Sequence, residues 1–588
     1  MSSNTLDPLA TALAEHRSGN LPAAEQLYRQ IVSQAPDHAA ALNLLGALCL
    51  QSNRAAEAVE WINRAIAINP TVPDYFSHLG AAYGVLGNHD AALASLRRAV
   101  QLDPRAANAH YNLGTALRNA GRLEEAVASF RNAIASDRNA PESHYNLANA
   151  LAELKRLDEA EASYRDALRL KPTYMRAMIN LANLLKDRER LGEAVEVLRD
   201  AVAADPKHLN ARINLGSMLR DAGEFNEALE TLQSAVALGP TSAEAHNNLG
   251  TVLHALAEFD LAREHYDQAL KLDPKLADAH FSRAMCLLRE GDLAEGFAEY
   301  EWRWKCKPFQ RPFAQPRWDG SPLAGRTLLL FAEQGLGDTL QFVRYAAVAK
   351  RRGGRVVVEC QEPLIALLQS CPGIDDLVSF GSPLPHFDVQ CSLMSLVGVL
   401  GLRLEELWEG PYLSADPARV ATWRERLSRS KGPRVGVCWR GNPKHLFDSQ
   451  RSFDLRQLAP VQQAIGVPLI GLQKDAAGLI KESGLDVVDL GPELDADGAF
   501  LDTAAVMMNL DLVISADTAV AHLAGALGVP IWLALSANSD WRWFIGHDDS
   551  LWYPSMRLFR QAKLNQWQDV FGRMAEEAAT LPARSDAS

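Results

Sequence analysis

Two short clusters of polar residues carry groups that group-transfer chemistry needs. The first follows the apolar run Leu328–Phe331 and ends, after a glycine turn, at Asp338. The second follows another apolar run and consists of Asp517 and Thr518, with His522 one helical turn further on. A carboxylate can take a proton from a reacting hydroxyl, whereas a hydroxyl or an imidazole can donate a hydrogen bond to a bound anion.

The first cluster has the pattern of a strand, a turn and a helix start, which opens a Rossmann-like unit. Gly335 and Gly337 allow a tight turn and the close approach of another group to the backbone. Asp338 then lies at the mouth of the turn, where open α/β sheets hold their ligands. We predict that Asp338 is a catalytic base. The alternative is that it caps the helix that we expect over 338–352.

In the second cluster, the helix that starts near Thr518 aims unpaired N–H groups and the positive end of its dipole at the sheet edge. Such a helix start is a natural seat for a nucleotide phosphate. We predict that Asp517, Thr518 and His522 bind a nucleotide donor. The alternatives are that Asp517 and Thr518 only cap the helix, and that His522 is a satisfied, half-buried histidine.

Further polar residues follow the strands expected at 434–439 and 468–472. They are Arg440, Asn442, Lys444, Gln473 and Lys474. Of these, we predict that Arg440, Asn442, Gln473 and Lys474 bind the donor. Arg440, with Lys444 or Lys474, could neutralise a leaving phosphate, and Asn442 could bind the nucleotide or the sugar.

We predict no metal and no cofactor. The Asp-Ala-Asp stretch at 495–497 falls in a polar loop, and the seven cysteines lack the spacing of metal ligands. Arg451 could bind a ligand, or it could pair with the nearby Asp448.

The elements that position these clusters follow from alternating strand and helix patterns. The patterns cover 326–420 and again 432–548, which predicts two Rossmann-like halves that face a cleft. Residues 549–588 are expected to pack back on the halves and to end in a tail. The proline-rich stretch 311–325 is a linker, and we interpret Trp302 and Trp304 before it as packing between the domains.

Residues 5–310 follow a 34-residue period. Prolines keep this period at Pro36, Pro70, Pro104, Pro172, Pro206, Pro240, Pro274 and Pro308. Small residues recur in the first half of the units, among them Gly46, Gly80, Gly114 and Gly250, and mark a close approach of helices. The pattern resembles the tetratricopeptide repeat, which predicts an α-solenoid of eight repeats and a degenerate ninth over 277–310.

One column of this repeat is not explained by packing. Asparagines recur at the same period at Asn112, Asn146, Asn180, Asn214 and Asn248. Because an amide both donates and accepts, such a row could bind the backbone of an extended polypeptide. The O-GlcNAc transferases carry a similar asparagine ladder on their repeats, and the resemblance implies a polypeptide client. The alternative is hydrogen bonding between repeats.

The overall composition limits the possible partners. A net charge of −13 argues against nucleic acid or an anionic membrane as the main partner. The first residues lack the basic and apolar segments of a secretory signal, and no apolar run is long enough for a transmembrane helix. We therefore expect a cytoplasmic location.

Several motifs in the second half of the chain are similar to a known family. ADTAVAHLAGALGVP at 516–530 resembles the signature of the heptosyltransferase-like GT-B glycosyltransferases. GLGD at 335–338 resembles the acceptor-side loop of that family, whose aspartate is its proposed base. WRGNP at 439–443, DWRW at 540–543 and WYPSMRLFRQ at 552–561 resemble the bacterial subgroup that carries tetratricopeptide repeats. Together with the repeats, the resemblance covers the whole chain.

The resemblance implies a metal-independent transferase that binds a nucleotide-sugar in its second half and an acceptor protein through its repeats. The comparable flagellin glycosyltransferases modify Ser or Thr with a pseudaminic- or legionaminic-type sugar, so flagellin is the implied acceptor. Two alternatives stay open: a saccharide-directed enzyme closer to true heptosyltransferases, and a non-catalytic repeat scaffold with a vestigial transferase domain.

Overall fold

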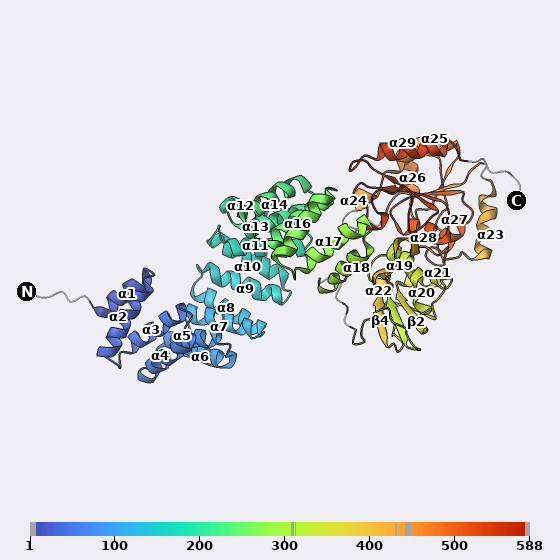
Figure 1. Ribbon diagram of the computed structural model, residues 1–588. Coiled ribbons are helices and arrows are strands. Elements are labelled where there is room, and N and C mark those ends of the chain that lie inside the picture. The colour runs from blue at the N-terminus through green and yellow to red at the C-terminus, as the bar shows by residue number, and fades with distance from the viewer. Residues whose placement is uncertain (1–6, 307–310, 312, 430–431, 442–447, 582–588) are drawn as a thin grey trace, which may run out of the picture. The chain divides into compact units, whose positions relative to one another are not determined.

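The computed structural model describes residues 7–306, 311, 313–429, 432–441 and 448–581. Its residues, coloured by position along the chain in Figure 1, form two compact units, 1–222 and 223–588. We expected a division near residue 310, at the end of the repeats. The boundary between these compact units falls inside the seventh repeat, and the last two helices of the repeat region, α17 (Ala277–Glu290) and α18 (Leu293–Tyr300), pack on the α/β region. The domain bounds that we expected stay a prediction.

Within residues 7–306 the helices come in consecutive pairs, one pair for each repeat, as the period predicts. The first unit contains α1 (Pro8–Arg17), α2 (Leu21–Gln34), α3 (Ala39–Gln51), α4 (Ala55–Ile68), α5 (Pro73–Val85), α6 (His89–Leu102), α7 (Ala107–Asn119), α8 (Leu123–Ser136), α9 (Pro141–Glu153), α10 (Leu157–Leu170), α11 (Met175–Asp187), α12 (Leu191–Ala204) and α13 (Leu209–Asp221). The second unit continues with α14 (Phe225–Leu238), α15 (Ala243–Ala255), α16 (Phe259–Leu272), α17, α18 and the 3-10 helix η1 (Glu301–Lys305).

The small residues of the repeat have the role that the sequence predicts. A Cβ on Gly46 would lie 2.5 Å from Cγ1 of Ile62, and one on Gly250 would lie 2.7 Å from Cε1 of Tyr266. In both cases the bulky residue belongs to the second helix of the same repeat. The glycine thus lets the two helices of a repeat approach closely.

The first α/β half contains parallel strands in the order β3-β2-β1-β4. Its strands and main helices are β1 (Thr327–Phe331), α19 (Leu336–Phe342), α20 (Ala346–Lys350), β2 (Arg355–Cys360), α21 (Ile365–Leu368), β3 (Asp376–Ser379), β4 (Val389–Ser392) and α22 (Leu396–Leu400). The single helix expected over 338–352 is wrong, because a 3-10 turn at Val343–Tyr345 separates α19 from α20. In that turn Arg344 donates to the carbonyl of Trp552 at 2.7 Å, and Tyr345 donates to that of Leu407 at 3.1 Å.

The second half contains parallel strands in the order β10-β9-β8-β5-β6-β7. Its elements are α23 (Pro417–Arg426), β5 (Val435–Cys438), α24 (Asp448–Arg451), α25 (Ala459–Ile465), β6 (Leu469–Gly471), α26 (Ala477–Ser483), β7 (Val487–Asp489), α27 (Leu501–Met507), β8 (Leu512–Ala516), α28 (Ala519–Leu527), β9 (Ile531–Leu535), β10 (Met556–Arg560) and α29 (Trp567–Ala578).

The end of the chain differs from the expectation for 549–588. Strand β10 pairs with β9 and extends the second sheet, and α29 packs on α25 of the same half. These elements are therefore part of the second half and not a segment laid back across both halves. The aromatic stretch before β10 does reach the first half, because the ring of Trp552 lies 5.6 Å from that of Phe342.

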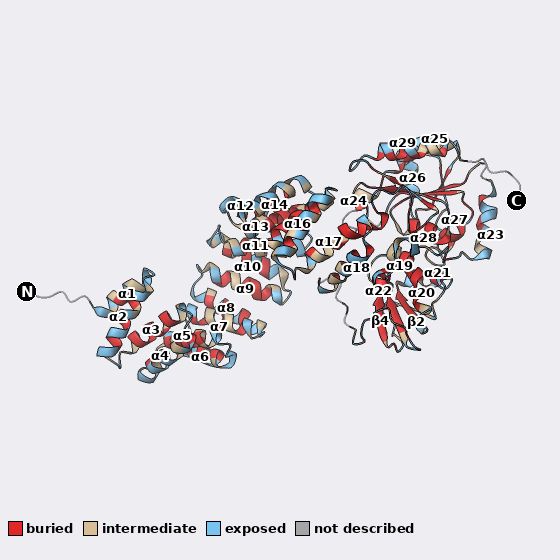
Figure 2. Cartoon of the chain, viewed as in Figure 1, coloured by how far each residue is buried: buried red, intermediate tan, exposed pale blue. Residues whose placement is uncertain are grey.

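Burial along the strands explains how the second sheet is covered (Figure 2). In β8, Leu512 and Ile514 pack with the helices α25 and α29, whereas Val513 packs in the core that contains α27 and α28. Alternate residues thus face opposite, covered sides, as in a parallel sheet with helices on both faces. Among the described helices none has both the length and the apolar character that crossing a bilayer requires.

Candidate active site

Both polar clusters lie where the order of strands changes direction in their sheet. In the first half the chain runs from β1 to β2 and β3, and β4 then joins on the other side of β1. In the second half it runs from β5 to β6 and β7, and β8 then joins on the other side of β5. Asp338 follows β1, Arg440 follows β5 and Asp517 follows β8. Ligands of open α/β sheets bind at the carboxyl ends of strands at such switch points.

Asp338 is held by two neighbouring groups. Its Oδ2 accepts the N–H of Gly335 at 2.7 Å, which is the capping contact that we gave as the alternative to catalysis. Its Oδ1 accepts a hydrogen bond from Arg542, which also donates to Asp540 at 2.6 Å. The side chain of Asp338 is 20% exposed. A carboxylate keeps further lone pairs beyond these two contacts, and the catalytic role stays a prediction.

Arg542 is a site residue that sequence reasoning missed. Its side chain is buried, and burial acts against its charge, but the carboxylates of Asp540 and Asp338 raise its pKa above the ordinary value. The guanidinium therefore stays charged and connects Asp338 in the first half with Asp540 in the second. The only signal in the sequence is a charged Asp and Arg inside the aromatic motif at 540–543.

Asp517 occupies a less polar setting. One oxygen of its carboxylate accepts Nε1–H of Trp543 at 2.9 Å. Burial and, next in size, the negative charge of Asp540 raise the pKa of Asp517 to about 6. A pKa close to the working pH is what a general base needs. Asp517, which the sequence assigns to donor binding, can therefore also accept a proton near neutral pH, and its role stays a prediction.

Thr518 and His522 lie on α28 as predicted. Thr518 is the N-cap residue, and its hydroxyl lies 3.4 Å from that of Ser515. His522 is buried, with Nδ1 at 3.1 Å from the hydroxyl of Tyr553. Burial, aided by the charges of Arg542 and Arg344, holds the pKa of His522 well below its ordinary value, so the ring is neutral at neutral pH. These contacts are those of the structural alternative, and donor binding by both residues stays a prediction.

The glycine turn and α28 touch directly. A Cβ on Gly337 would lie 2.8 Å from Cδ2 of His522 and 3.5 Å from Cα of Ala519. The close approach that glycine was expected to allow is therefore present at Gly337, and the approaching group belongs to the second half. On Gly335 the nearest atom to a Cβ would be Oδ2 of Asp338, at 3.2 Å.

The remaining donor-side residues lie beside β5 and β6. The N–H of Arg440 donates to Oε1 of Gln473 at 3.1 Å, and the Sγ of Cys438 lies 3.5 Å from the same oxygen. The side chains of Arg440 and Lys474 are exposed. Asn442 and Lys444 lie outside the described residues.

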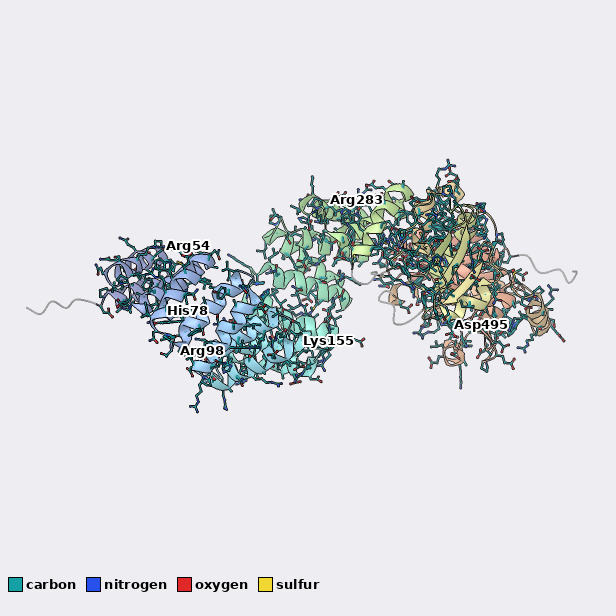
Figure 3. All side chains as sticks on the ribbon, turned by 90° about the horizontal axis from the view of Figure 1, so that it is seen from below. Arg54, His78, Arg98, Lys155, Arg283 and Asp495 are labelled. Carbon is teal, nitrogen blue, oxygen red and sulfur yellow. The ribbon has the colours of Figure 1, made fainter. Side chains whose placement is uncertain are left out.

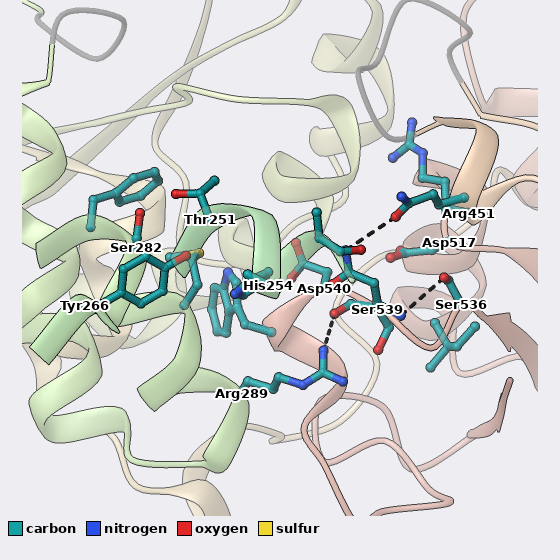
Figure 4. A pocket seen from close by; sticks show the side chains of 17 residues that line it. Thr251, His254, Tyr266, Ser282, Arg289, Arg451, Asp517, Ser536, Ser539 and Asp540 are labelled. Atoms are coloured by element: carbon teal, nitrogen blue, oxygen red, sulfur yellow. Dashed lines mark hydrogen bonds between the residues drawn. The ribbon is translucent and has the colours of Figure 1, made fainter. Parts of the chain in front are cut away.

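Arg451 forms the pair that the sequence offered as its alternative role. Its Nε donates to Oδ1 of Asp448 at 3.2 Å. The same side chain lines a cavity of about 360 Å³ that also contains Asp517 (Figure 4).

Two regions that are far apart in the sequence form the walls of this cavity. Helices α15, α16 and α17 of the last repeats form one wall, and the second α/β half forms the other (Figure 4). The lining residues are Thr251, His254, Ala255, Tyr266, Phe281, Ser282, Met285, Arg289, Gln450, Arg451, Asp517, Leu535, Ser536, Asn538, Ser539, Asp540 and Trp541. The repeat wall combines apolar side chains, among them Phe281 and Met285, with the cation Arg289, and the α/β wall contains two carboxylates and Arg451.

Burial lowers the pKa of His254 to about 4, so this residue adds no charge to the repeat wall at neutral pH.

The ninth repeat also holds the loops of both α/β halves. On the first half, Arg303 donates to Oε1 of Glu333 at 3.0 Å, just before the glycine turn. On the second half, Arg289 donates to the carbonyls of Ser539 at 2.6 Å and Ala537 at 3.2 Å. The side chain of Arg303 is fully buried. The last repeat is therefore part of the framework that positions Asp338 and Asp540.

Trp304 has the packing role that we expected. Its ring lies 6.0 Å from that of Phe331 in β1, and Trp302 stacks on His280 at 3.7 Å.

The asparagine column is used in different ways along the chain. In the first unit, the amides of Asn146 and Asn180 donate to the hydroxyls of Tyr111 at 2.9 Å and Tyr145 at 3.2 Å, each in the preceding repeat. His78 (labelled in Figure 3) holds the same column position, and its Nδ1 lies 3.0 Å from Oδ1 of Asn43. These are the contacts between repeats that we gave as the alternative to peptide binding.

For the other asparagines of the column, the hydrogen bonds found are local ones, to residues of the same helix. Asn214 donates to the carbonyl of Asn210 on its own helix at 2.7 Å, and Oδ1 of Asn248 lies 3.4 Å from the amide of its neighbour Asn247. All five asparagines are half-buried. Peptide binding by the column stays a prediction.

In the part of the chain that the structure describes, no group of three or more His, Cys, Asp or Glu side chains is arranged to hold a metal ion. The Asp495 side chain instead accepts hydrogen bonds from the N–H groups of Asp502 at 2.7 Å and Thr503 at 3.0 Å.

Comparison with known families identifies the repeats. A tetratricopeptide-repeat model matches residues 9–73, 79–141, 115–174 and 247–304. Two other tetratricopeptide-repeat models match 208–275 and 175–204. The N-terminal region of the chain, up to residue 304, thus consists of tetratricopeptide repeats, which indicates protein partners.

Among curated proteins, the chain is similar to Protein FlbA of Caulobacter vibrioides, with 28% identity over 334 residues. The matched region covers 50% of this chain and 54% of FlbA, so this chain spans only about half the length of that protein. Among solved structures, YrrB, described as a TPR protein with an unusual peptide-binding site, is 24% identical over 31% of this chain and 95% of its own, with a TM-score of 0.28.

Two further solved structures are similar over about a third of this chain. The thermophilic TPR protein TTC0263 of Thermus thermophilus is 27% identical over 30% of this chain and 97% of its own, with a TM-score of 0.28. PilF of Pseudomonas aeruginosa is 22% identical over 36% of this chain and 96% of its own, with a TM-score of 0.32.

Proposed function

We propose that the second unit is a glycosyltransferase of the GT-B class, which transfers a sugar from a nucleotide donor to a hydroxyl of a polypeptide. One observation carries the proposal: the carboxylate Asp517, at the switch point of the second sheet, faces a cavity whose other wall is formed by tetratricopeptide repeats. Switch points are where α/β sheets hold nucleotides, and repeat surfaces are where such proteins bind polypeptides. Transfer of a sugar requires the nucleotide donor and the polypeptide acceptor to lie next to each other, and this cavity is bordered by both kinds of surface.

In this proposal the donor phosphates lie at the start of α28. The first N–H groups of a helix and its dipole favour an anion there. The exposed side chain of Arg440 and that of Arg451 supply positive charge, so charge on the leaving phosphate is balanced by the protein itself. No metal or other cofactor is needed in this mechanism.

The reaction is a displacement at the anomeric carbon. The acceptor oxygen forms a bond to this carbon, the bond to the donor phosphate breaks, and the nucleotide leaves with the electron pair. The hydroxyl proton passes to a base. Asp517 lines the cavity and has a pKa of about 6, so we propose it as this base. Asp338 stays the base that the family resemblance implies, and comparison of the two variants separates them.

The acceptor in the proposal is a protein that binds to the repeats. The resemblance to flagellin glycosyltransferases makes flagellin the first candidate, with Ser or Thr as the acceptor residue and a pseudaminic- or legionaminic-type sugar. This identity rests on the resemblance alone, whereas a protein acceptor is also supported by the repeats.

The test uses the purified full-length chain with flagellin and a panel of CMP-, UDP-, GDP- and ADP-sugars. Released nucleotide is measured by chromatography and the acceptor by intact mass. An increase in acceptor mass by one sugar residue supports the proposal and names the sugar. Transfer to a lipid-linked glycan instead of protein would support the saccharide-directed alternative. Absence of nucleotide release with every donor, in protein that is folded and binds acceptor, would favour the non-catalytic scaffold.

A further inference from the structure

The wall of the cavity that comes from the repeats is the same helix face that carries the asparagine column. On α15, Asn248 is followed by Thr251 and Ala255 at intervals of three and four residues, which places them on one side of the helix. Thr251 and Ala255 line the cavity. A polypeptide that follows this face therefore arrives at the cavity.

The same arrangement of residues is found 34 positions further on, in the ninth repeat. Ser282, Met285 and Arg289 on α17 correspond to Asn248, Thr251 and Ala255 on α15, and all three line the cavity. Ser282 thus occupies the column position of the ninth repeat at the cavity wall (Figure 4). The column continues into the cavity, but there the amide is replaced by a small hydroxyl.

The two walls differ in the chemistry that they offer. Ala255, Phe281 and Met285 from the repeats, together with Trp541, form an apolar surface, whereas Asp517 and Asp540 lie on the α/β side. An apolar side chain that leaves water for the first surface gains free energy. A carboxylate there loses its hydration and lies close to the carboxylates of Asp517 and Asp540, and the two cations that line the cavity, Arg289 and Arg451, already bind carbonyl groups and Asp448. The cavity therefore distinguishes between polypeptides by the residues that flank the acceptor hydroxyl.

We infer that the cavity is the acceptor subsite, in which an extended polypeptide places an aliphatic residue next to its Ser or Thr against Ala255, Phe281 and Met285. The hydroxyl of that Ser or Thr then faces Asp517. The inference rests on the proposed function for the role of the hydroxyl, but the binding preference itself does not depend on transfer.

The experiment measures peptide binding to the full-length chain in the absence of any donor. Two fluorescein-labelled peptides are compared by anisotropy: one has a single serine flanked by valines, and in the other aspartates replace these valines. The valine peptide is expected to bind about tenfold or more tightly, which is the gain from burying one aliphatic side chain.

Variants at Met285 locate the preference. Met285→Glu places a charge on the apolar wall and should weaken binding of the valine peptide by about tenfold or more, whereas Met285→Leu should keep it. Thr115→Glu is the matched control, because Thr115 holds the equivalent helix position in a repeat of the first unit and does not line the cavity. Circular dichroism and thermal melting verify that each variant is folded.

The outcomes separate this inference from the proposed function. Equal affinities for the two peptides, binding of neither, or equal effects of Met285→Glu and Thr115→Glu would overturn the inference even if sugar is transferred to protein. If the valine preference is present and is lost in folded Met285→Glu, the inference stands, even where no donor yields a glycosylated acceptor and the proposed function fails. If Met285→Glu does not fold, the valine preference of the wild-type chain and its retention in Met285→Leu decide the question.

Discussion

The junctions β1–α19 and β8–α28 both place an aspartate at the carboxyl edge of a parallel sheet, yet the two carboxylates differ in their surroundings. Asp338 accepts hydrogen bonds from a backbone N–H and from a buried arginine. Asp517 accepts one from the indole of Trp543 and lines a cavity, where burial raises its pKa. The comparison teaches that a strand–turn–helix motif positions an acid, whereas burial and the surrounding charges decide whether that acid is held in an ion pair or has a raised pKa.

The largest expected effect is on the rate of sugar transfer, measured in variants of the two carboxylates. If the second unit is the proposed glycosyltransferase, Asp517→Asn should lower the transfer rate by about 10²- to 10⁴-fold, because it removes the proposed base while keeping the shape of the side chain. Asp338→Asn should have a smaller effect that arises from the weaker bond to Arg542. The transfer rate of the wild-type chain should rise as the pH increases through about 6. In Asp517→Asn the rate should no longer depend on pH in this range. Steady-state kinetics checks all three, and a greater loss in Asp338→Asn would reverse the assignment.

The next prediction tests the ion pair that fixes Asp338. Arg542→Met should lower the free energy of unfolding by about 3 kcal/mol, because it leaves the partly buried carboxylate of Asp338 without its charged partner. Arg557→Met is the matched control, since Arg557 pairs with Glu577 on the surface and such pairs contribute about 1 kcal/mol or less. Chemical denaturation compares the two, and equal losses would contradict the role of Arg542.

A third prediction concerns the contact between the two junctions. Gly337→Ala should destabilise the chain by about 1–3 kcal/mol, because the new methyl group meets the ring of His522 and that ring is held by Tyr553. Gly335→Ala serves as the control, since its methyl group would meet only the end of the Asp338 side chain. Thermal melting measures both variants. A loss confined to Gly335→Ala would show that the packing at Gly337 is less constrained than the structure indicates.

The smallest expected effect concerns the charge of Asp517. A raised pKa means that stability is lost as pH rises from the ordinary value of 3.8 through about 6, because the folded state then carries a buried charge. Asp517→Asn should therefore raise the melting temperature at pH 8 and leave it nearly unchanged at pH 4.

The control for this prediction has the opposite sign. The hydrogen bond from Arg456 lowers the pKa of Asp454, so Asp454→Asn should lower the melting temperature at pH 8. Melting curves at the two pH values decide the question. An increase for Asp517→Asn that is equal at both pH values would contradict a buried charge as its cause.

Much of the fold could be predicted because local patterns dictate it. The 34-residue period fixed the helix pairs, and the glycines in it are those that meet Ile62 and Tyr266. Apolar runs followed by polar residues located β1, β5, β6 and β8. The end of the chain could not be predicted in this way, because whether Met556–Arg560 joins a sheet depends on its pairing with β9, a contact that leaves no local signal.

The site was predictable only in part, for a related reason. The aspartates stand out because they follow apolar runs, but the partner of Asp338 lies 204 positions further on, at Arg542. The cavity combines the repeat helices with the sheet edge, and neither segment alone indicates that they meet. The amides of Asn146 and Asn180 could not be assigned either, since a tyrosine in the preceding repeat competes for them.

The sequence by itself determined the repeats, the succession of strands and helices, and the identity of the two acidic junctions, because these depend on periodicity and on the turn chemistry of neighbouring residues. Only the tertiary structure decided the environment of each acid. Desolvation and charge depend on groups brought together from distant parts of the chain, and here they tie Asp338 to Arg542 and place Asp517 beside the repeats.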